Sequence, residues 1–571
     1  MTIDFPLPPG LLLIFSALLL PMTPPLLRKL LLLGVPLASL LLVLLLRNDY
    51  VLTIPFLGYQ LELIRLTAYG KVFAIIFSVM AFAGNLFALN QARTSELTAA
   101  MLYAGAAICV TTAGDLVTVF IFWEVMALGS AFVIWSNRTK KSYKAGMRYM
   151  AIHLLGGVVL MIGITGHIAT TGSIHFELMK LDSFAHWMIL AGFLLNVGAP
   201  PLSAWLPDAY PEASPSGSVF LSAFTTKTAV YVLIVGFAGT KILIAIGLYM
   251  VFYGIIYALL ENDMRRILAY SIVNQVGFMV TGIGLSPSGE TSSLALNGVA
   301  AHAFSHIIYK ALLLMSAGSV LYQTGKRKCT DLGGLFQSMP VTTACGIVGA
   351  LSISAFPLTS GFISKSMVSS AAAHDHYQLA WFLLTAATAG VFLHAGIKFP
   401  WFVFFQKDSG MRPADPPFNM RLAMYLFSFL CLAIGIFPAL LYSLLPPLAT
   451  AYHPYEATHV ITQLQLLLFS GLAFFWLLPL MQRTLTISLD FDWFYRKAGY
   501  TLARGLETLL TRVYNLARQH LNQVFKRLQR GRYTNMKQFG LWALSVRGMV
   551  WISLFTFGIT LVIVYYFSLG V

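Results

Sequence analysis

The chain has 571 residues, of which 58% are hydrophobic and only 10% are charged, and its mean hydropathy is +0.77. Soluble domains carry about 25% charged residues, so this composition excludes a soluble globular protein and indicates a membrane protein with many spans. The formal charge of +16 does not indicate a nucleic-acid partner, because the basic residues lie in short loops and one C-terminal segment, where they set membrane orientation.

Runs of apolar residues predict an all-α polytopic membrane protein with about sixteen transmembrane helices, each needing about 20 apolar residues. The stretch 50–67 is too short and too polar to span, and its alternating pattern predicts a short extramembrane hairpin. The predicted spans are 10–26, 28–46, 68–91, 97–113, 115–137, 148–171, 186–204, 217–238, 242–260, 267–285, 296–321, 339–364, 375–404, 419–446, 461–481 and 547–568.

Two consecutive blocks of five predicted spans occupy residues 97–238 and 242–404. Because five is odd, the second block enters the membrane from the opposite side, so we expect two inverted repeats. The fourth span of each block contains a proline, Pro201 in the first and Pro357 in the second. Proline breaks a helix, and matched broken helices build a midplane ion site in many transporters. Proline is also common in membrane helices, but the matched position favours the repeat.

The remaining predicted parts lie on either side of the two blocks. They are residues 1–96 with N-terminal helices and the hairpin, 419–481 with additional membrane helices, 482–546 with a basic amphipathic segment, and 547–571 with a terminal span.

Basic residues predict the orientation. With the N-terminus outside, every clearly basic loop falls on one side, and the opposite loops are poor in lysine and arginine. The positive-inside rule therefore predicts a multi-pass protein of the plasma (inner) membrane with these loops in the cytoplasm. The basic segments are Arg28 with Lys29, 138–144, Arg265 with Arg266, 326–328 and 482–546.

An amphipathic pattern runs from about residue 496 to 530. Apolar residues recur there with the period of one helical face, and basic residues lie between them. We expect a lateral helix of roughly 50 Å along the cytoplasmic membrane surface, attracted by anionic lipid. A cytoplasmic helical tail is the alternative, against which the predicted terminal span argues. The apolar residues are Leu502, Leu506, Leu509, Val513, Leu516, Leu521, Val524 and Leu528.

Charged residues occur inside spans that otherwise consist of apolar residues. Glu124 lies in DLVTVFIFWEVMALGS, nine residues after Asp115, and Lys227 lies near mid-span in SAFTTKTAVYVL. A charge at bilayer depth costs at least about 2.5–3.5 kcal/mol on insertion scales, so such residues mark ion or proton pathways. A buried lysine can exchange protons, whereas an arginine stays charged. A structural ion pair between helices is the competing explanation for either residue alone.

His302, His306 and Lys310 are spaced i, i+4, i+8 in AHAFSHIIYK and so share one helical face. Two histidines at i, i+4 can also bind zinc, but no matching carboxylate or cysteine cluster occurs in the sequence, which favours a proton relay over a metal site. We expect no metal and no other cofactor. Lys365 follows the second break in PLTSGFISK, and Lys398 lies in LHAGIKFPW, nearer an interface, where snorkelling is an alternative.

Five stretches between about residues 110 and 370 carry a family resemblance: the segment ending in FWE, then WLPDAYPEASPSGSVFLSAFTTK, DMRRILAYSIVNQVGF, HAFSHIIYKALLLMSAGS and FPLTSGFISK. Together they resemble the antiporter-like subunits of respiratory complex I and the D-type subunit of Mrp cation/proton antiporters. The resemblance implies fourteen core helices in two inverted five-helix repeats, plus extra helices. It also implies movement of protons, or their exchange for sodium, with other hydrophobic antiporter-like subunits as partners.

The resemblance further implies a proton path, with no catalytic chemistry in the chain itself. Its driving force would come from partners or an ion gradient, and whether the complex is an oxidoreductase or a hydrogenase stays open. The residues that match the family's motifs are Glu124, Lys227, His302, His306, Lys310 and Lys365, with Lys398 as the repeat counterpart of Lys227.

One departure from the family pattern concerns the first repeat. The family has a lysine nine residues before the tryptophan of W-L-P, and here that tryptophan is Trp205 and the position is Asn196. Asparagine can bind a water molecule but carries no charge. Either another group, such as His153 on the neighbouring span or Asp115, modulates the glutamate, or the first half-channel works differently. The alternative function is a scaffold that has lost transport and anchors partners through the lateral helix.

Overall fold

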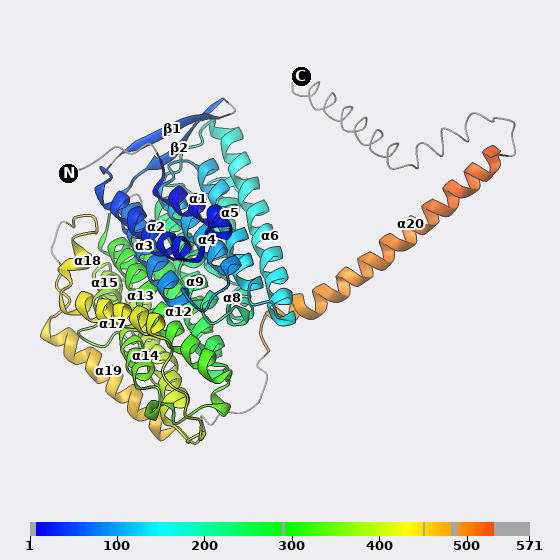
Figure 1. Cartoon of the computed structure of the whole chain (residues 1–571). Coiled ribbons are helices and arrows are strands. Elements are labelled where there is room, and N and C mark those ends of the chain that lie inside the picture. Colours follow the sequence, from blue (N-terminus) through cyan, green and yellow to red (C-terminus); the bar gives the residue numbers. More distant parts are fainter. Residues whose placement is uncertain are drawn as a thin grey trace. The chain divides into compact units, whose positions relative to one another are not determined.

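Long apolar helices make up nearly all regular structure, as the hydropathy pattern predicts (Figure 1). The computed structural model describes residues 7–48, 50–56, 58–287, 292–448, 452–480 and 489–529. The chain divides into two units, Met1–Asp492 and Trp493–Val571, and each is described by itself.

The first unit is a helical bundle with one hairpin (Figure 1). Its helices are α1 (Pro9–Leu19), α2 (Pro25–Leu45), α3 (Ala68–Ala88), α4 (Thr94–Thr112), α5 (Leu116–Trp135), α6 (Lys140–Thr171), α7 (Phe184–Val197), α8 (Trp205–Ala209), α9 (Gly217–Leu221), α10 (Thr225–Phe237), α11 (Ile242–Leu260), α12 (Met264–Leu285), α13 (Leu294–Thr324), α14 (Pro340–Ile353), α15 (Ser360–His374), α16 (Gln378–Val391), α17 (Phe418–Ile436), α18 (Ala439–Tyr442) and α19 (Ala457–Trp476).

The fold is all-α and polytopic, but the count of sixteen spans is not reached in the described residues. Twelve helical stretches there are long and apolar enough to cross a membrane, and three shorter apolar helices accompany them. The short ones correspond to the predicted spans 10–26, 186–204 and 339–364, which end early because the helix breaks inside them. The predicted span 547–568 lies outside the described residues.

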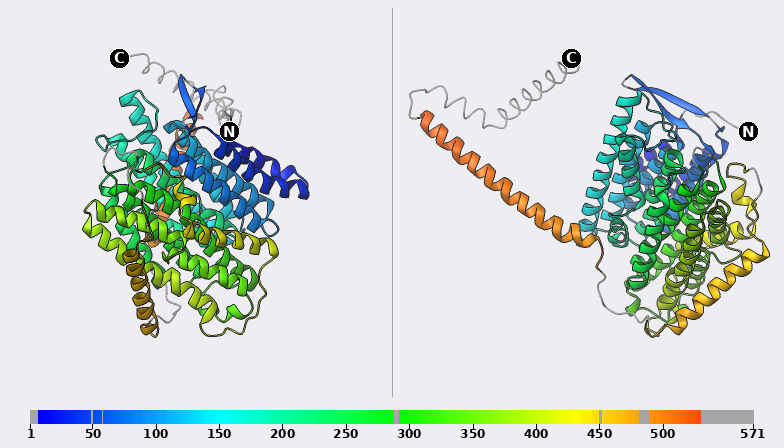
Figure 2. Two further views of the ribbon diagram at one scale, coloured as in Figure 1. Left: turned by 90° about the vertical axis from the view of Figure 1, so that its left-hand side faces the viewer. Right: turned by 180° about the vertical axis from the view of Figure 1, so that it is seen from behind.

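Burial divides the helices into an interior and a periphery. Almost every residue of α12 and α13 is buried, as is the stretch that includes α9 and α10. By contrast, α2 and α19 expose most of their apolar residues, which in a membrane protein face lipid. The N-terminal helices pack on the outside, α1 against α4 and α2 against α3, and Figure 2 shows these blue helices along one side of the bundle.

The stretch predicted as a hairpin forms two antiparallel strands, β1 (Val51–Phe56) and β2 (Tyr59–Arg65). It lies at one end of the bundle, where Glu62 backbone groups bond Gly114 and the carboxylate of Asp115 (Figure 1). The turn between α4 and α5 is therefore held to the hairpin.

Each five-span block contains a broken helix in its fourth span. Gly198 caps α7 at φ 83°, and the chain runs without helix through Pro200 and Pro201 before α8. A residue at this φ is normally glycine, since a Cβ would clash with the backbone. In the second block, α14 ends at Ile353 and α15 begins at Ser360, with Pro357 between them. The breaks expose backbone carbonyls inside the bundle.

The second unit contains the predicted amphipathic segment as α20 (Gly499–Gln529), a helix of 31 residues that spans about 46 Å. A short π-helix, η7 (Phe494–Ala498), precedes it. The rest of the predicted segment 482–546 lies partly outside the described residues.

Candidate functional site

Glu124 lies near the middle of α5, and its carboxylate is pressed against α6. A Cβ added at Gly157 of α6 would collide with Oε1 of Glu124. The same Oε1 is enclosed and has no hydrogen-bond partner among the described residues. Glycine at this point of α6 therefore makes room for a carboxylate oxygen to which no donor in the described structure is bonded.

Two further polar side chains without full hydrogen bonding adjoin the same stretch of α6. Asn196 of α7 is fully buried, and neither atom of its amide has a partner in the described part of the chain. A Cβ added at Gly156 would lie 3.6 Å from its Oδ1. His153, three residues earlier, donates from Nδ1 to the Tyr149 carbonyl at 2.9 Å, while its Nε2 lacks a described partner. Three polar side chains, each with an atom that has no partner in the described structure, thus gather along residues 153–157.

Asp115 lies far from this cluster, about 13 Å from Glu124 along the helix axis. It is the N-cap of α5 and accepts hydrogen bonds from the backbone and hydroxyl of Thr118 and from the backbone of Glu62. These are the bonds of a helix cap that also fixes the hairpin.

Lys227 is fully buried in the first turn of α10, just after an interruption at residues 222–224. The sequence predicts that Lys227 lies near the middle of one continuous span. The break after α9 instead places Lys227 near the start of a new helix. Its Nζ donates to the Ser222 carbonyl at 2.6 Å and to Thr226 Oγ1 at 3.1 Å. Ser222 is the C-cap of α9, where carbonyls lack helical partners.

Lys365 in α15 repeats this arrangement in the second block. Its Nζ donates to the carbonyl of Ile353, the last residue of α14, at 2.8 Å, and lies 5.5 Å from the centre of the Phe278 ring. A cavity of about 300 Å³ adjoins it and is also lined by Glu456 and His459. Both lysines are thus held by the carbonyl end of an interrupted helix.

One face of α13 carries His302, His306 and Lys310, and it lies between Lys227 and Lys365. Nε2 of His302 lies 3.1 Å from Gln275 Oε1 of α12, and its Nδ1 lies 3.1 Å from Ser364 Oγ of α15. Tyr309 also donates to Gln275 Oε1, at 3.1 Å. Since this oxygen can only accept, Nε2 of His302 carries the hydrogen in that contact.

His306 and Lys310 complete this face. Neither ring nitrogen of His306 has a partner within the described ranges, although its ring centre lies 6.2 Å from that of His302. Lys310 donates from Nζ to Ser271 Oγ at 2.9 Å. Both ring nitrogens of His306 are therefore unpaired among the described residues, on the helical face that also carries His302 and Lys310.

Lys398 is fully buried in the described structure. It lies in the π-helix η5 (Phe392–Lys398), and its Nζ donates to the carbonyls of Ala258, Leu259 and Glu261 at 2.6–2.7 Å, at the C-terminal end of α11. A cation at a helix C-terminus is favourable. π-Helical turns often occur at functional sites.

Several buried polar residues were not predicted. His394 lies four residues before Lys398, the spacing of His306 and Lys310, and its Nε2 lacks a partner among the described residues. That repeated spacing is the signal by which it could have been found. Gln275 looks like an ordinary polar residue of a span, and only the packing of α12 on α13 reveals its contact with His302.

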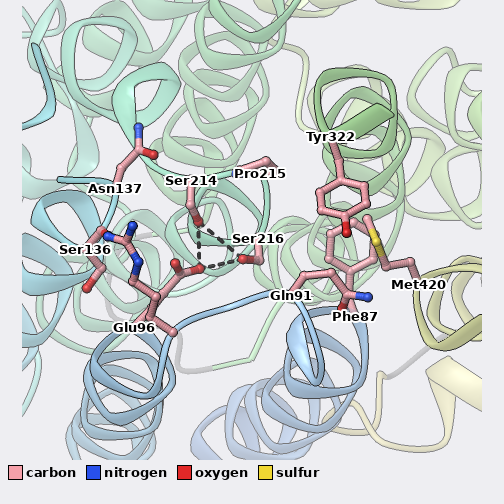
Figure 3. Close-up of a pocket in the computed structure, with 11 residues that line it drawn as sticks. Phe87, Gln91, Glu96, Ser136, Asn137, Ser214, Pro215, Ser216, Tyr322 and Met420 are labelled. Carbon is pink, nitrogen blue, oxygen red and sulfur yellow. Dashed lines mark hydrogen bonds between the residues drawn. The ribbon is translucent and has the colours of Figure 1, made fainter. Parts of the chain in front are cut away.

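Glu96 was also missed, because it lies beside Arg93 at the edge of a predicted span and resembles an interfacial residue. In the structure it is buried and lines a cavity of about 170 Å³ together with Ser214 and Ser216 (Figure 3). No group of three or more His, Cys, Asp or Glu residues in the described parts could hold a metal ion.

The sequence of this chain is similar to those of known membrane proteins. Residues 113–392 match the family described as NADH:quinone oxidoreductase/Mrp antiporter, transmembrane region. Hydrogenase-4 component B of Escherichia coli is 26% identical over 417 residues, 65% of this chain and 62% of that protein. The D-type subunit of the Na(+)/H(+) antiporter of Alkalihalophilus pseudofirmus is 29% identical over 288 residues, 47% of this chain and 57% of that protein. The chain thus spans less than two thirds of either relative.

A solved structure of the membrane-bound sulfane sulfur reductase, an archaeal respiratory membrane complex, contains a chain with the same fold. The TM-score is 0.72 at 21% identity, with 98% of this chain and 100% of that chain covered. The resemblance expected from the sequence is confirmed: residues 113–392 match the transmembrane region of NADH:quinone oxidoreductase/Mrp antiporter proteins, and the similar proteins include a hydrogenase component and an antiporter subunit.

Proposed function

We propose that the chain moves protons, or exchanges protons for sodium, along a buried series of titratable side chains within a multi-subunit membrane complex. The observation that carries this proposal is the burial of three lysines and two histidines in the interior helices α10, α13 and α15. The path comprises Glu124, Lys227, His302, His306, Lys310 and Lys365, with Lys398 at its second-block end.

The partners of the lysine amines favour proton exchange over a structural role. Among the described residues, the recorded partners of Lys227, Lys310 and Lys365 are carbonyls and hydroxyls, and none is a carboxylate. A carboxylate would fix the ammonium as one half of an ion pair, and breaking a buried pair costs about 3–5 kcal/mol. Neutral acceptors instead stabilise the ammonium while allowing the amine to release its proton.

The central groups provide the steps between the lysines. His306 has unpaired nitrogens on the face between His302 and Lys310, and an imidazole takes a proton on one nitrogen while it releases one from the other. The enclosed, unpaired atoms of Glu124, His153 and Asn196 extend the path into the first block, because bound water satisfies such groups when protein donors are absent.

The orientation and partners form part of the proposal. The basic loops would face the cytoplasm, in the plasma membrane, and the exposed apolar faces would contact lipid and other antiporter-like subunits. The basic lateral helix α20 would bind anionic lipid.

The test uses the complex purified through a tag on this chain and reconstituted into vesicles that report internal pH. We expect Lys227→Ala to lower the gradient-driven proton flux by at least about 100-fold, the scale on which loss of a proton-transferring group acts. The matched control is Lys241→Ala, since Lys241 also donates to two carbonyls but is exposed. Equal flux in wild type and Lys227→Ala would contradict the proposed path.

Mass spectrometry of the purified complex identifies the driving force. Redox subunits would indicate a path driven by electron transfer. Small hydrophobic antiporter subunits alone would indicate secondary exchange, and the flux would then depend on sodium.

A further inference from the structure

A carboxylate outside the proposed path lies at the wall of the cavity shown in Figure 3. Glu96, in the first turn of α4, is only 2% exposed, and its Oε1 accepts hydrogen bonds from Ser214 Oγ at 2.7 Å and Ser216 Oγ at 2.5 Å. Its Oε2 accepts no hydrogen bond from the described residues, and this oxygen is not fully enclosed by protein atoms. The second oxygen therefore faces the cavity, which has room for several water molecules.

The cavity lies at the end of the bundle where basic loops gather. Ser136 and Asn137 line it immediately before the basic loop 138–144, and Tyr322 lines it shortly before the basic segment 326–328. Arg93, which precedes α4, lines it as well. Water that enters here would come from the side of the basic loops.

The charges that act on Glu96 come from two elements. Arg93 precedes its own helix, and Arg265 of α12 donates to the carbonyls of Ala213 and Ser214 at 2.9 and 2.8 Å. Arg265 thereby holds the loop whose serines bind Glu96. Both cations favour the carboxylate form, whereas burial of Glu96 favours the neutral carboxyl, so the two protonation states are opposed within this site.

Two structural connections lead from this cavity to Lys227. Ser216 is the N-cap and Ser222 the C-cap of α9, whose five residues rise about 7.5 Å, and the Ser222 carbonyl holds Nζ of Lys227. On α4, Tyr103 lies seven residues after Glu96, on the same helical face, and its hydroxyl lies 2.6 Å from Thr225 Oγ1 in the first turn of the Lys227 helix.

We propose that this cavity is a water-filled inlet from the basic-loop end of the bundle and that Glu96 is the group that accepts protons there on their way to Lys227. The inference rests on the proposed function and adds an entry point to it. Glu96 is the proton-accepting residue, and Ser214 and Ser216 are positioning residues that hold its carboxylate.

Only O–H and N–H bonds change in this step. A hydronium ion in the cavity gives its proton to the free oxygen of Glu96, which becomes a neutral carboxyl. The carboxyl then returns a proton to cavity water or to a serine hydroxyl, which passes on its own proton as it receives one. The neutral amine of Lys227 takes up the last proton and becomes ammonium.

The test compares Glu96→Gln, Glu96→Asp and wild type in the reconstituted complex. Glutamine still accepts the serine hydrogen bonds but cannot carry the proton, so we expect the flux to fall by at least about tenfold. Aspartate restores a carboxylate and should recover part of the flux. The matched control is Glu62→Gln, which removes another buried carboxylate near the opposite end of α4, where Arg65 binds it, and should leave the flux unchanged.

A second measurement tests water access independently of transport. A cysteine at position 216, introduced as Ser216→Cys, should react with a small membrane-impermeant methanethiosulfonate added to the basic-loop side, above the background of the four buried native cysteines. Absence of labelling would overturn the inlet. Because this measurement does not use Glu96→Gln, it still decides the question if that variant fails to assemble.

The outcomes separate the inlet from the path itself. Wild-type flux in Glu96→Gln alongside loss of flux in Lys227→Ala would overturn the inlet and leave the path standing. Absence of flux in the wild-type complex would contradict the proposed function, and the labelling result would then still decide whether water reaches Ser216.

Discussion

At the residue scale, the two buried lysines are held differently from the polar side chains that gather beside α6. Lys227 and Lys365 each donate to a carbonyl at the end of an interrupted helix. Glu124, His153 and Asn196 instead present buried atoms without partners in the described structure. Buried polar atoms are normally paired, so this cluster marks the place where the chain departs from ordinary packing.

We propose that His153 takes the place of the missing lysine beside Glu124 in this cluster. We expect His153→Gln to lower the proton flux by about tenfold or more, because glutamine can hydrogen-bond water but cannot carry a proton. The control is His374→Gln, since His374 is exposed at the end of α15. Unchanged flux in His153→Gln would show that Glu124 works without it.

Asn196→Lys separates a rewired half-channel from one that has lost transport. We expect no gain in flux, because the new ammonium would be fully buried in a cluster that already contains His153. A marked gain, measured in the same vesicles, would instead favour the scaffold interpretation.

At the element scale, two glycines occupy positions that a residue with a Cβ would not tolerate. Gly157 lets α6 approach the Glu124 carboxylate, and Gly198 ends α7 in the left-handed conformation. Both positions depend on the missing Cβ, although for different reasons: close approach at the first and backbone conformation at the second.

Gly198→Ala should destabilise the first block without touching any charged group. A left-handed conformation costs a residue with a Cβ about 1–2 kcal/mol, so the unfolding midpoint of the purified chain should fall. Gly34→Ala is the control, since a Cβ at Gly34 of α2 meets no atom within 4 Å. Equal midpoints for the two variants would contradict the assigned backbone role.

At the scale of the whole molecule, the interior helices carry the polar groups and the outer helices carry apolar surface. This reverses the arrangement of a soluble protein and is the one expected when the outer solvent is lipid. The basic amphipathic helix α20 belongs to the second unit and adds a surface suited to the membrane interface.

Charge removal from α20 tests that membrane role. A peptide of residues 494–529 with Arg504, Arg512 and Arg518 changed to glutamine should bind anionic vesicles roughly 100-fold more weakly, at about 1 kcal/mol for each basic residue. Binding to neutral vesicles, measured by sedimentation, should change little. Equal loss on both kinds of vesicle would indicate an apolar attachment.

The sequence by itself determined the membrane class, most helix positions and the family resemblance, because hydropathy and motif spacing are local properties of the chain. It also indicated the breaks near Pro201 and Pro357, since proline acts on its own helix. The interruption before Lys227 escaped prediction, because no proline or glycine marks residues 222–224.

Only the tertiary structure decided which groups meet. Gln275 and His302 are far apart in sequence and touch because α12 packs against α13, and Lys398 reaches the end of α11 in the same way. The structure also shows that Asp115 is a helix cap. Glu96, which resembles an interfacial residue in the sequence, lies in the wall of a cavity. Contacts between distant segments depend on how helices pack, and no local pattern encodes that packing.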